Sequence, residues 1–309
     1  MTKGIIVLGM HRGGTSLVGD LVASWGAYAG GEQELLPADS NNRQGYWEYL
    51  PLVRFNQELL AGLSADWFLP PAEADRRTLR KRAAEPSYRG RAEQLIRAMR
   101  DGGRSWFWKD PRMALLLPFW QEVLPDVVYV VVVRHPLDIA MSLKKRDHFP
   151  VSASLLLWQL HMLSLLRDTQ HAPEKIFVRY ESLLRHPSEQ CERLSAFLER
   201  RCEPRRAREE AVSKMVRRVN PDLRHHRSLT TLSDLPEATP EQKALYAFLT
   251  DEADDPSARF DETRFAVYAG WREYLLTISA LKLMWSHFRG KEHLLLSTLP
   301  PTLRQLFGM

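Results

Sequence analysis

The chain has 309 residues, with 43 lysine and arginine residues against 38 aspartate and glutamate residues, and 2 cysteines. Hydrophobic residues make up 44% and charged residues 26% of the sequence, which is typical of a folded globular protein and excludes disorder. Cys191 and Cys202 stand alone, so we expect a reducing compartment and neither a disulfide scaffold nor a thiolate metal site. The formal charge of +5 fits an anionic partner without choosing among nucleic acid, a membrane surface and a small anion.

No apolar run approaches the roughly 20 residues that a membrane-spanning helix needs. The longest uninterrupted run is Val127–Val133. Residues 5–10 are too few for the apolar region of a signal peptide and lead directly into His11 and Arg12. The sequence therefore predicts a soluble, cytoplasmic protein without a transmembrane segment.

Short β-branched or aromatic runs alternate with helix-like segments over much of the chain. The predicted strands are residues 4–8, 105–109, 127–133 and 175–179. A helix is expected at 15–25, where apolar residues recur at helical spacing. Buried strands that alternate with helices form a parallel sheet with both faces covered, so we expect a doubly wound α/β fold.

A long insertion, at about residues 27–104, separates the first two predicted strands. It holds a loop with the aromatic pair Tyr46 and Trp47, and then helical segments; loops of this kind often carry function. Residues 76–100 are a basic helical stretch interrupted at Pro86, which we interpret as a solvated helix face.

The strand pattern stops after Glu199. We expect residues 1–230 to form the α/β domain and residues 231–309 to form a helical extension packed on it. The amphipathic segment 262–288 indicates core packing or a dimer face. This interpretation leaves a homodimer open.

The segment after the first predicted strand, GMHRGGTSLV at residues 9–18, follows the Walker A frame of glycine, four residues, glycine, lysine and serine or threonine at every position but one. Thr15 stands where the lysine is expected. Glycines let successive backbone N–H groups face an anion, and the following helix directs its positive end at the same place. We therefore expect a phosphate-binding loop in which Arg12 replaces the missing cation.

The most apolar predicted strand ends in Arg134, where a P-loop NTPase commonly has a magnesium-ligating aspartate. This arginine indicates a second anion site, and Pro136 suits the first turn of a helix that carries Ser142 about two turns further on. A sulfuryl group bears less negative charge than a terminal phosphoryl group, so arginine, lysine and backbone dipoles can support its transfer. We expect no metal ion.

Both motifs resemble those of the PAPS-dependent sulfotransferase family, in particular its bacterial members. The residues that match the family's 5′-phosphosulfate loop, with the residue that follows it, are Arg12, Gly13, Gly14, Thr15, Ser16 and Leu17. Arg134 and Ser142 match its 3′-phosphate motif, and Arg146 matches an arginine that protein-tyrosine sulfotransferases have one turn further on. The resemblance implies a P-loop-like fold and 3′-phosphoadenosine 5′-phosphosulfate (PAPS) as sulfuryl donor.

Two shorter segments extend the resemblance. KDPRM begins at Lys109 and is similar to a bacterial motif that would bring Lys109 and Arg112 to the edge of the sheet where α/β proteins bind ligands. VRYESLL is similar to the family segment whose tyrosine contacts adenine, which implies that role for Tyr180.

A basic segment, NPDLRHHR at residues 220–227, lies where a loop closes over the nucleotide in this family, which implies that Arg224 and Arg227 contact the nucleotide. The Arg-Lys-Gly triplet of the cytosolic steroid and phenol sulfotransferases is absent. Closure over the nucleotide must therefore be built differently in this chain.

Sulfuryl transfer needs cations for the spreading charge and a base for the acceptor proton. Arg12 and Lys109 are the predicted catalytic cations, and Glu48 is the predicted base, since carboxylates serve as bases in similar enzymes. Alternatively, Glu48 begins a helical segment at 48–60 and only interacts with the helix dipole. Further candidates for the base are Glu32, Asp110, His11 and His135.

The sequence thus predicts transfer of a sulfuryl group from PAPS to a hydroxyl or amine of a small-molecule, sugar or lipid acceptor, with release of 3′,5′-ADP. Aromatic residues in or near the insertion, such as Trp67 and Phe68, suggest an apolar or ring-bearing acceptor, or else core packing. A P-loop-like kinase or nucleotide hydrolase is one alternative, against which Thr15 and Arg134 argue. A non-catalytic nucleotide-binding protein is another; no nucleic-acid partner is expected, because basic and aromatic residues do not alternate along a strand.

Overall fold

The fold is centred on one parallel sheet of four strands in the order β2-β1-β3-β4. The computed structural model describes residues 4–39, 42, 45–100, 103–124, 126–172, 174–203, 206–220, 231–253 and 260–287. The strands are β1 (Gly4–Leu8), β2 (Trp106–Lys109), β3 (Val127–Val133) and β4 (Lys175–Arg179). The predicted α/β class is confirmed, and all four strands lie where the sequence predicted them.

Helices connect and cover these strands. Before β3 they are α1 (Thr15–Trp25), α2 (Leu50–Ala61), α3 (Glu73–Ala84), α4 (Pro86–Arg100) and α5 (Met113–Val123), with a short 3-10 turn η1 (Glu32–Glu34). After β3 they are α6 (Pro136–Asp147), α7 (Val151–Thr169), α8 (Tyr180–Arg185), α9 (Pro187–Glu199), α10 (Arg208–Arg218), α11 (Pro240–Ala247) and α12 (Trp271–His287). Short turns η3 (Leu232–Asp234), η4 (Phe248–Glu252) and η5 (Glu262–Phe265) lie among the last of these.

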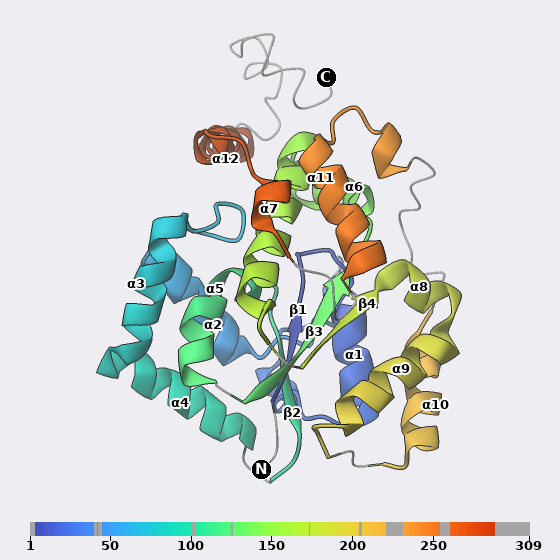
Figure 1. The fold of residues 1–309 in the computed structure, drawn as a ribbon. Helices are drawn as coiled ribbons and strands as arrows, with labels where there is room; N and C mark the ends of the chain where they lie inside the picture. Colours follow the sequence, from blue (N-terminus) through green and yellow to red (C-terminus); the bar gives the residue numbers. More distant parts are fainter. Residues whose placement is uncertain are drawn as a thin grey trace.

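Alternate residues of the buried strands face two different hydrophobic clusters. Along β3, Val128, Val130 and Val132 pack with α1, α9 and α10, whereas Tyr129 and Val131 belong to the cluster that includes α2–α5 and α7. Figure 1 shows these two helical layers on either side of the sheet. The expectation of a sheet covered on both faces is therefore correct.

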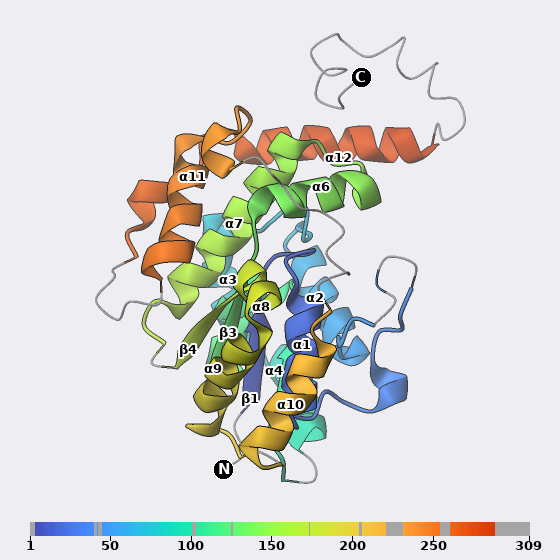
Figure 2. The same cartoon turned by 90° about the vertical axis from the view of Figure 1, so that its right-hand side faces the viewer.

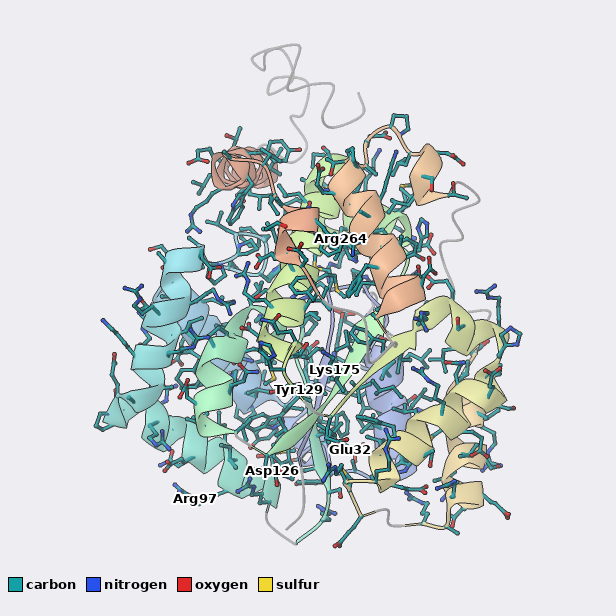
Figure 3. All side chains as sticks on the ribbon, viewed as in Figure 1. Glu32, Arg97, Asp126, Tyr129, Lys175 and Arg264 are labelled. Atoms are coloured by element: carbon teal, nitrogen blue, oxygen red, sulfur yellow. The ribbon has the colours of Figure 1, made fainter. Side chains whose placement is uncertain are left out.

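The order of the strands creates a crevice at one end of the sheet. β1 has β2 on one side and β3 on the other, so the chain leaves the carboxyl ends of β1 and β3 in opposite directions, the arrangement at which open α/β sheets bind ligands. The pairing of Tyr129 with Lys175 lies at the opposite, amino end of the β3–β4 ladder (Figure 3). The loop after β1 and Arg134 after β3 both lie at the crevice.

Three of the helices after β3, namely α6, α11 and α12, lie beyond the carboxyl ends of the strands. Figures 1 and 2 show all three at this end. Gln159 of α7 donates a hydrogen bond to the carbonyl of Phe265 and accepts one from Gln242 of α11. This contact joins parts of the C-terminal extension to α7, while the domain boundaries stay a prediction.

Two helical segments differ in detail from the sequence patterns. Within the amphipathic segment 262–288, η5 ends at Phe265 and α12 begins only after Gly270, whose φ is +87°. The helix expected from Glu48 begins at Leu50. Within the described ranges, no single helix is long and apolar enough to cross a bilayer, and α6 and α7 meet that test only jointly, as a pair bent by 118°.

Candidate active site

The loop between β1 and α1 is a tight turn. The N–H of Gly13 donates to the carbonyl of Met10 at 2.9 Å, and both Arg12 (φ +64°) and Gly14 (φ +87°) have left-handed backbone conformations. A Cβ atom on Gly14 would lie 2.4 Å from Cδ2 of Tyr180, so this position requires glycine. Gly14, the N-cap residue of α1, has no side chain that could cap the helix, and the first turn holds no acidic residue, which leaves its positive end suited to an anion.

The second predicted anion site lies directly beside this loop. Arg134 follows β3, and its Nη1 donates to the carbonyl of Arg12 at 2.9 Å. Its guanidinium lies 4.6 Å from the centre of the Tyr180 ring, at the start of α8. Pro136 occupies the first turn of α6, as predicted. Arg134 thereby links the ends of β1, β3 and β4.

Ser142 of α6 connects the two sites. Nε of Arg12 donates to Oγ of Ser142 at 2.8 Å, although 130 positions separate them in the sequence. Burial lowers the pKa of Arg12, and the neighbouring charges of Arg146 and Arg134 also lower it. Two further guanidinium groups close enough to lower the pKa of Arg12 favour a bound anion. The two predicted anion sites therefore form one continuous cationic socket.

A buried ion pair lies at the end of β2. Nζ of Lys109 is 2.6 Å from Oε1 of Glu48 and 3.5 Å from Oγ of Ser16 in the loop. Lys109 is 1% and Glu48 6% exposed. Burial raises the pKa of Glu48, and the charge of Lys109 opposes this rise. The structure thus brings Glu48, Lys109 and the loop together.

Glu48 lies before α2, and its carbonyl accepts a hydrogen bond from the N–H of Leu36. The alternative that Glu48 occupies the first turn of a helix is therefore wrong. The two aromatic residues before it differ in their surroundings. Tyr46 donates to Asp39 and lies 5.9 Å from Nζ of Lys109, whereas Trp47 packs on Phe107 of the sheet. Burial also raises the pKa of Tyr46 to about 12, so its hydroxyl acts as a donor.

Two residues that the sequence did not indicate, Asn56 and Trp120, hold Asp110 in place next to Lys109. Trp120 Nε1 donates to Oδ1 of Asn56 at 2.8 Å, and Nδ2 of Asn56 donates to Asp110 at 2.9 Å. Because an indole can only donate, it fixes the orientation of the amide. Asp110 also accepts from the N–H and from Nη1 of Arg112, which lies 3.9 Å from Oε2 of Glu48.

These contacts bear on the choice of base. Asp110 is fully buried and both of its oxygens accept hydrogen bonds, so the geometry favours a structural role. Glu32 is exposed on η1, away from the strand ends that carry the loop (Figure 3). The N–H of His135 donates to Glu181, and its ring packs on Tyr246. Glu48 has the closest contact with a predicted catalytic cation among these candidates.

His11 lies in a different environment. Its ring is 4.5 Å from Trp67 and 6.3 Å from the ring of His161 on α7. Nε2 of His11 is buried and has no hydrogen-bond partner among the described residues. Burial, followed by the charge of Arg112, lowers the pKa of His11 well below its usual range. The fold therefore favours the neutral form of this histidine. Trp67, Phe68 and Phe149 pack together beside it.

The remaining predicted site residues lie partly inside and partly outside the described part of the chain. Thr15 is buried at the start of α1, where Ser16 and Leu17 follow it. Arg146 pairs with Asp147 and lies 5.5 Å from the ring of Trp67. Arg224 and Arg227 lie outside the described residues, so their predicted contact with the nucleotide stays a prediction.

A family model described as "Sulfotransferase family" matches residues 4–204. No curated protein matches the chain. Three solved structures are similar in fold, at 16–17% identity. The sulfotransferase domain of the Synechococcus PCC 7002 olefin synthase has a TM-score of 0.45, with 90% of this chain and 95% of that chain covered. The sulfotransferase domain from the curacin biosynthetic pathway has a TM-score of 0.46, with 80% and 96% covered. The sulfotransferase STF9 from Mycobacterium avium has a TM-score of 0.44, with 93% and 77% covered.

Proposed function

The chain belongs to the sulfotransferase family, and we propose that it transfers the sulfuryl group of PAPS to a hydroxyl or amine of a small-molecule, sugar or lipid acceptor. The observation that carries the proposal is the continuous cationic socket, in which Arg12 of the loop contacts Ser142 and Arg134 holds the Arg12 carbonyl. Arginine forms fork-shaped, charge-assisted hydrogen bonds with phosphate. A socket of this kind suits a small nucleotide that carries anionic groups at both ends.

The residues present fit PAPS. The uncapped start of α1 and the tight loop suit its 5′-phosphosulfate, while Arg134, Ser142 and Arg146 suit its 3′-phosphate. Tyr180, whose ring lies next to both Gly14 and Arg134, is the residue proposed to contact adenine. When bound, PAPS supplies an activated sulfuryl group and is released as 3′,5′-ADP.

The catalytic roles follow from charge and position. Arg12 and Lys109 neutralise negative charge on the oxygens around the transferred group, a task that preorganised cations perform in a largely buried site. Glu48 accepts the proton that the acceptor hydroxyl or amine releases. Its raised pKa favours proton acceptance, and its contact with Lys109 keeps the carboxylate beside the loop.

The walls near the loop support an uncharged, apolar or ring-bearing acceptor. Trp67, Phe68 and Phe149 pack together next to His11. Aromatic side chains provide large apolar contact area, while a few polar groups orient the ligand. The acceptor hydroxyl would then lie between these rings and Glu48.

Ligand-dependent melting tests the proposal. We expect 3′,5′-ADP to raise the melting temperature of the protein and ATP with magnesium to leave it unchanged, since a ligand stabilises only the state that binds it. Arg12→Ala should abolish the shift. Arg97→Ala is the matched control, because the Arg97 side chain is 67% exposed in the last turn of α4 (Figure 3). A shift with ATP and magnesium but not with 3′,5′-ADP would favour a kinase or nucleotide hydrolase.

A transfer assay then tests catalysis. Labelled PAPS should transfer its label to at least one member of a panel of phenols, alcohols, sugars and lipids. Binding of 3′,5′-ADP without transfer to any member of such a panel would favour a non-catalytic nucleotide-binding protein.

A further inference from the structure

The segment between α2 and α3 carries an aromatic residue that packs on His11. Residues 64–70, called the wall segment below, contain a tight turn, in which the N–H of Asp66 donates to the carbonyl of Leu69 and the N–H of Leu69 donates to the carbonyl of Asp66. Trp67 lies within this turn, and its ring is 4.5 Å from the ring of His11. The placement of the turn therefore sets one wall of the space next to the phosphate loop.

The backbone at the start of the wall segment is strained. Ser64 has a φ of +51°, a left-handed conformation that persists at a non-glycine residue where surrounding contacts hold it. The carbonyls of Ser64 and Pro70, one at each end of the segment, accept hydrogen bonds from the first turn of α12. The shape of the segment thus depends on a helix that comes much later in the chain.

Arg272 donates both of these hydrogen bonds. Its Nη1 lies 2.9 Å from the carbonyl oxygen of Pro70, and its Nη2 lies 3.3 Å from that of Ser64. A guanidinium is a rigid, planar fork that carries several N–H donors, so one arginine can hold two carbonyls at a set separation. In this way a single side chain joins the two ends of the wall segment.

The helix that carries Arg272 is anchored by other residues. The hydroxyls of Tyr274 and Ser152, which lies in the first turn of α7, are hydrogen-bonded at 2.8 Å. Leu275 and Ile278 are buried in the hydrophobic cluster that α7 shares. These contacts give Arg272 a fixed base from which to hold the wall segment.

We propose that Arg272 is a positioning residue for the acceptor site: it holds the wall segment so that Trp67 stays against His11, and it thereby gives the C-terminal region a part in the choice of a ring-bearing acceptor. Arg272 lies outside residues 4–204, which the family model matches. The inference rests on the proposed function, because it needs an acceptor beside the phosphate loop. Loss of the arginine releases the strained backbone of Ser64 and lets the Trp67 ring move away from His11.

Fluorine NMR tests the positioning directly. In protein labelled with 5-fluorotryptophan, the Trp67 signal is the one that disappears in Trp67→Phe, and Trp25→Phe identifies the Trp25 signal in the same way. We expect Arg272→Met to shift or broaden the Trp67 signal and to leave that of Trp25 unchanged, since Trp25 packs on the other face of the sheet. An unchanged Trp67 signal in Arg272→Met would overturn the inference.

Lys243→Met is the matched control. Lys243 of α11 donates to the carbonyl of Ser233 at 2.7 Å, so this variant also removes a hydrogen bond between a cationic side chain and the backbone in the C-terminal region. It leaves the contacts of Arg272 in place, and the Trp67 signal should therefore stay where it is. A shift as large as that in Arg272→Met would assign the effect to general loosening of the C-terminal region and overturn the role of Arg272.

Binding of 2-naphthol, an uncharged ring-bearing alcohol, tests the consequence for the acceptor site. With 3′,5′-ADP saturating, calorimetry should show about tenfold weaker affinity for 2-naphthol in Arg272→Met, as expected for loss of hydrogen bonds from a charged group. Affinity for 3′,5′-ADP should stay within about threefold, because substitutions at distant sites act independently. Arg272→Lys keeps the charge without the fork, so it should lose less affinity, and it replaces Arg272→Met should that variant fold poorly.

A double-substitution cycle assigns the effect to Trp67. In a Trp67→Leu background, Arg272→Met should weaken 2-naphthol binding no further, because the ring that the arginine positions is already absent. Equal losses of affinity in the two backgrounds would overturn the inference.

The proposed function and the inference fail differently. A wild-type protein that does not bind 3′,5′-ADP overturns the proposed function, and the inference with it. A wild-type protein that binds 3′,5′-ADP but not 2-naphthol overturns the part of Arg272 in the choice of a ring-bearing acceptor. A wild-type protein that binds both, together with an Arg272→Met variant that binds 2-naphthol equally well, overturns only the positioning role of Arg272.

Discussion

Lys109 and Glu48 form an ion pair with an N–O distance of 2.6 Å inside the protein, although 61 positions separate them. Lys109 ends the edge strand β2, whereas Glu48 belongs to the insertion that precedes α2. Moving two charges from water into the protein interior often costs more free energy than their mutual attraction returns. A pair of this kind beside the predicted phosphate loop is therefore better explained by the proposed chemistry than by stability.

Replacement of the predicted base should separate binding from catalysis. In Glu48→Gln, we expect sulfuryl transfer at saturating PAPS to fall by about 100-fold or more, since a positioned general base contributes on the order of 10²–10⁴-fold. The glutamine oxygen can still accept from Lys109, so affinity for 3′,5′-ADP should stay within about threefold. Rapid-quench transfer and calorimetry measure the two quantities. Near-normal turnover would remove Glu48 as the base and direct attention to His11.

Replacement of the lysine alone should cost stability as well as activity. Lys109→Met leaves Glu48 buried with Arg112 3.9 Å away, and breaking a buried pair in this way costs about 3–5 kcal/mol of unfolding free energy. The double variant with Glu48→Gln should recover most of that stability, because no uncompensated charge remains, but no transfer activity. Urea unfolding of the wild type, Lys109→Met and the double variant measures these differences in unfolding free energy. Equal stability of Lys109→Met and wild type would contradict a buried ion pair.

Local patterns predicted the strands and the loop, but not the contacts that complete the site. β1 and β3 are continuous buried runs, and the glycines of the loop have a direct conformational reason. The bond between Arg12 and Ser142 depends instead on the tertiary placement of α6, which packs against α7, beside the loop that follows β1. In the same way, Asn56 and Trp120 support Asp110 only because α2 lies against α5.

The break between η5 and α12 shows a different limit. The amphipathic segment 262–288 does not itself mark where its helix begins, since residues 265–269 are all apolar and helical spacing is clear only from Trp271 onward. In the structure, residues 266–270 interrupt it and Gly270 has a positive φ. A single glycine in a helical pattern is a weak signal, because helices tolerate it at about 1 kcal/mol.

Gly14 offers a test of the loop itself. In Gly14→Ala, the methyl group would lie 2.4 Å from Cδ2 of Tyr180 at a φ of +87°, so both the loop and the tyrosine ring must move. We expect a loss of roughly 1–3 kcal/mol in unfolding free energy and at least tenfold weaker binding of 3′,5′-ADP. Gly90→Ala is the matched control, since a methyl group added there would meet no atom within 4 Å and alanine favours the interior of α4 by about 0.5–1 kcal/mol. Unchanged nucleotide affinity in Gly14→Ala would argue against this loop as the phosphate site.

His161 should make stability depend on pH. Its Nδ1–H donates to the carbonyl of Leu157, and burial lowers the pKa of the imidazole to about 4. In the unfolded chain the usual value is about 6.5. Between these two values the unfolded state binds more protons than the folded state, so stability is full above about pH 6.5 and is lost as the pH falls toward 4. The loss from this residue is on the order of 3 kcal/mol.

The variant His161→Asn keeps a donor for Leu157 but does not titrate. Its unfolding free energy should therefore decline less between pH 7 and pH 4 than that of the wild type, even if loss of the ring lowers stability at every pH. His11 still contributes to the decline, because its pKa is lowered as well, so the slope should decrease without vanishing. His171→Asn, which removes an exposed histidine, controls for the loss of one imidazole. Identical pH slopes for His161→Asn and the wild type would show that His161 is not held neutral by the fold.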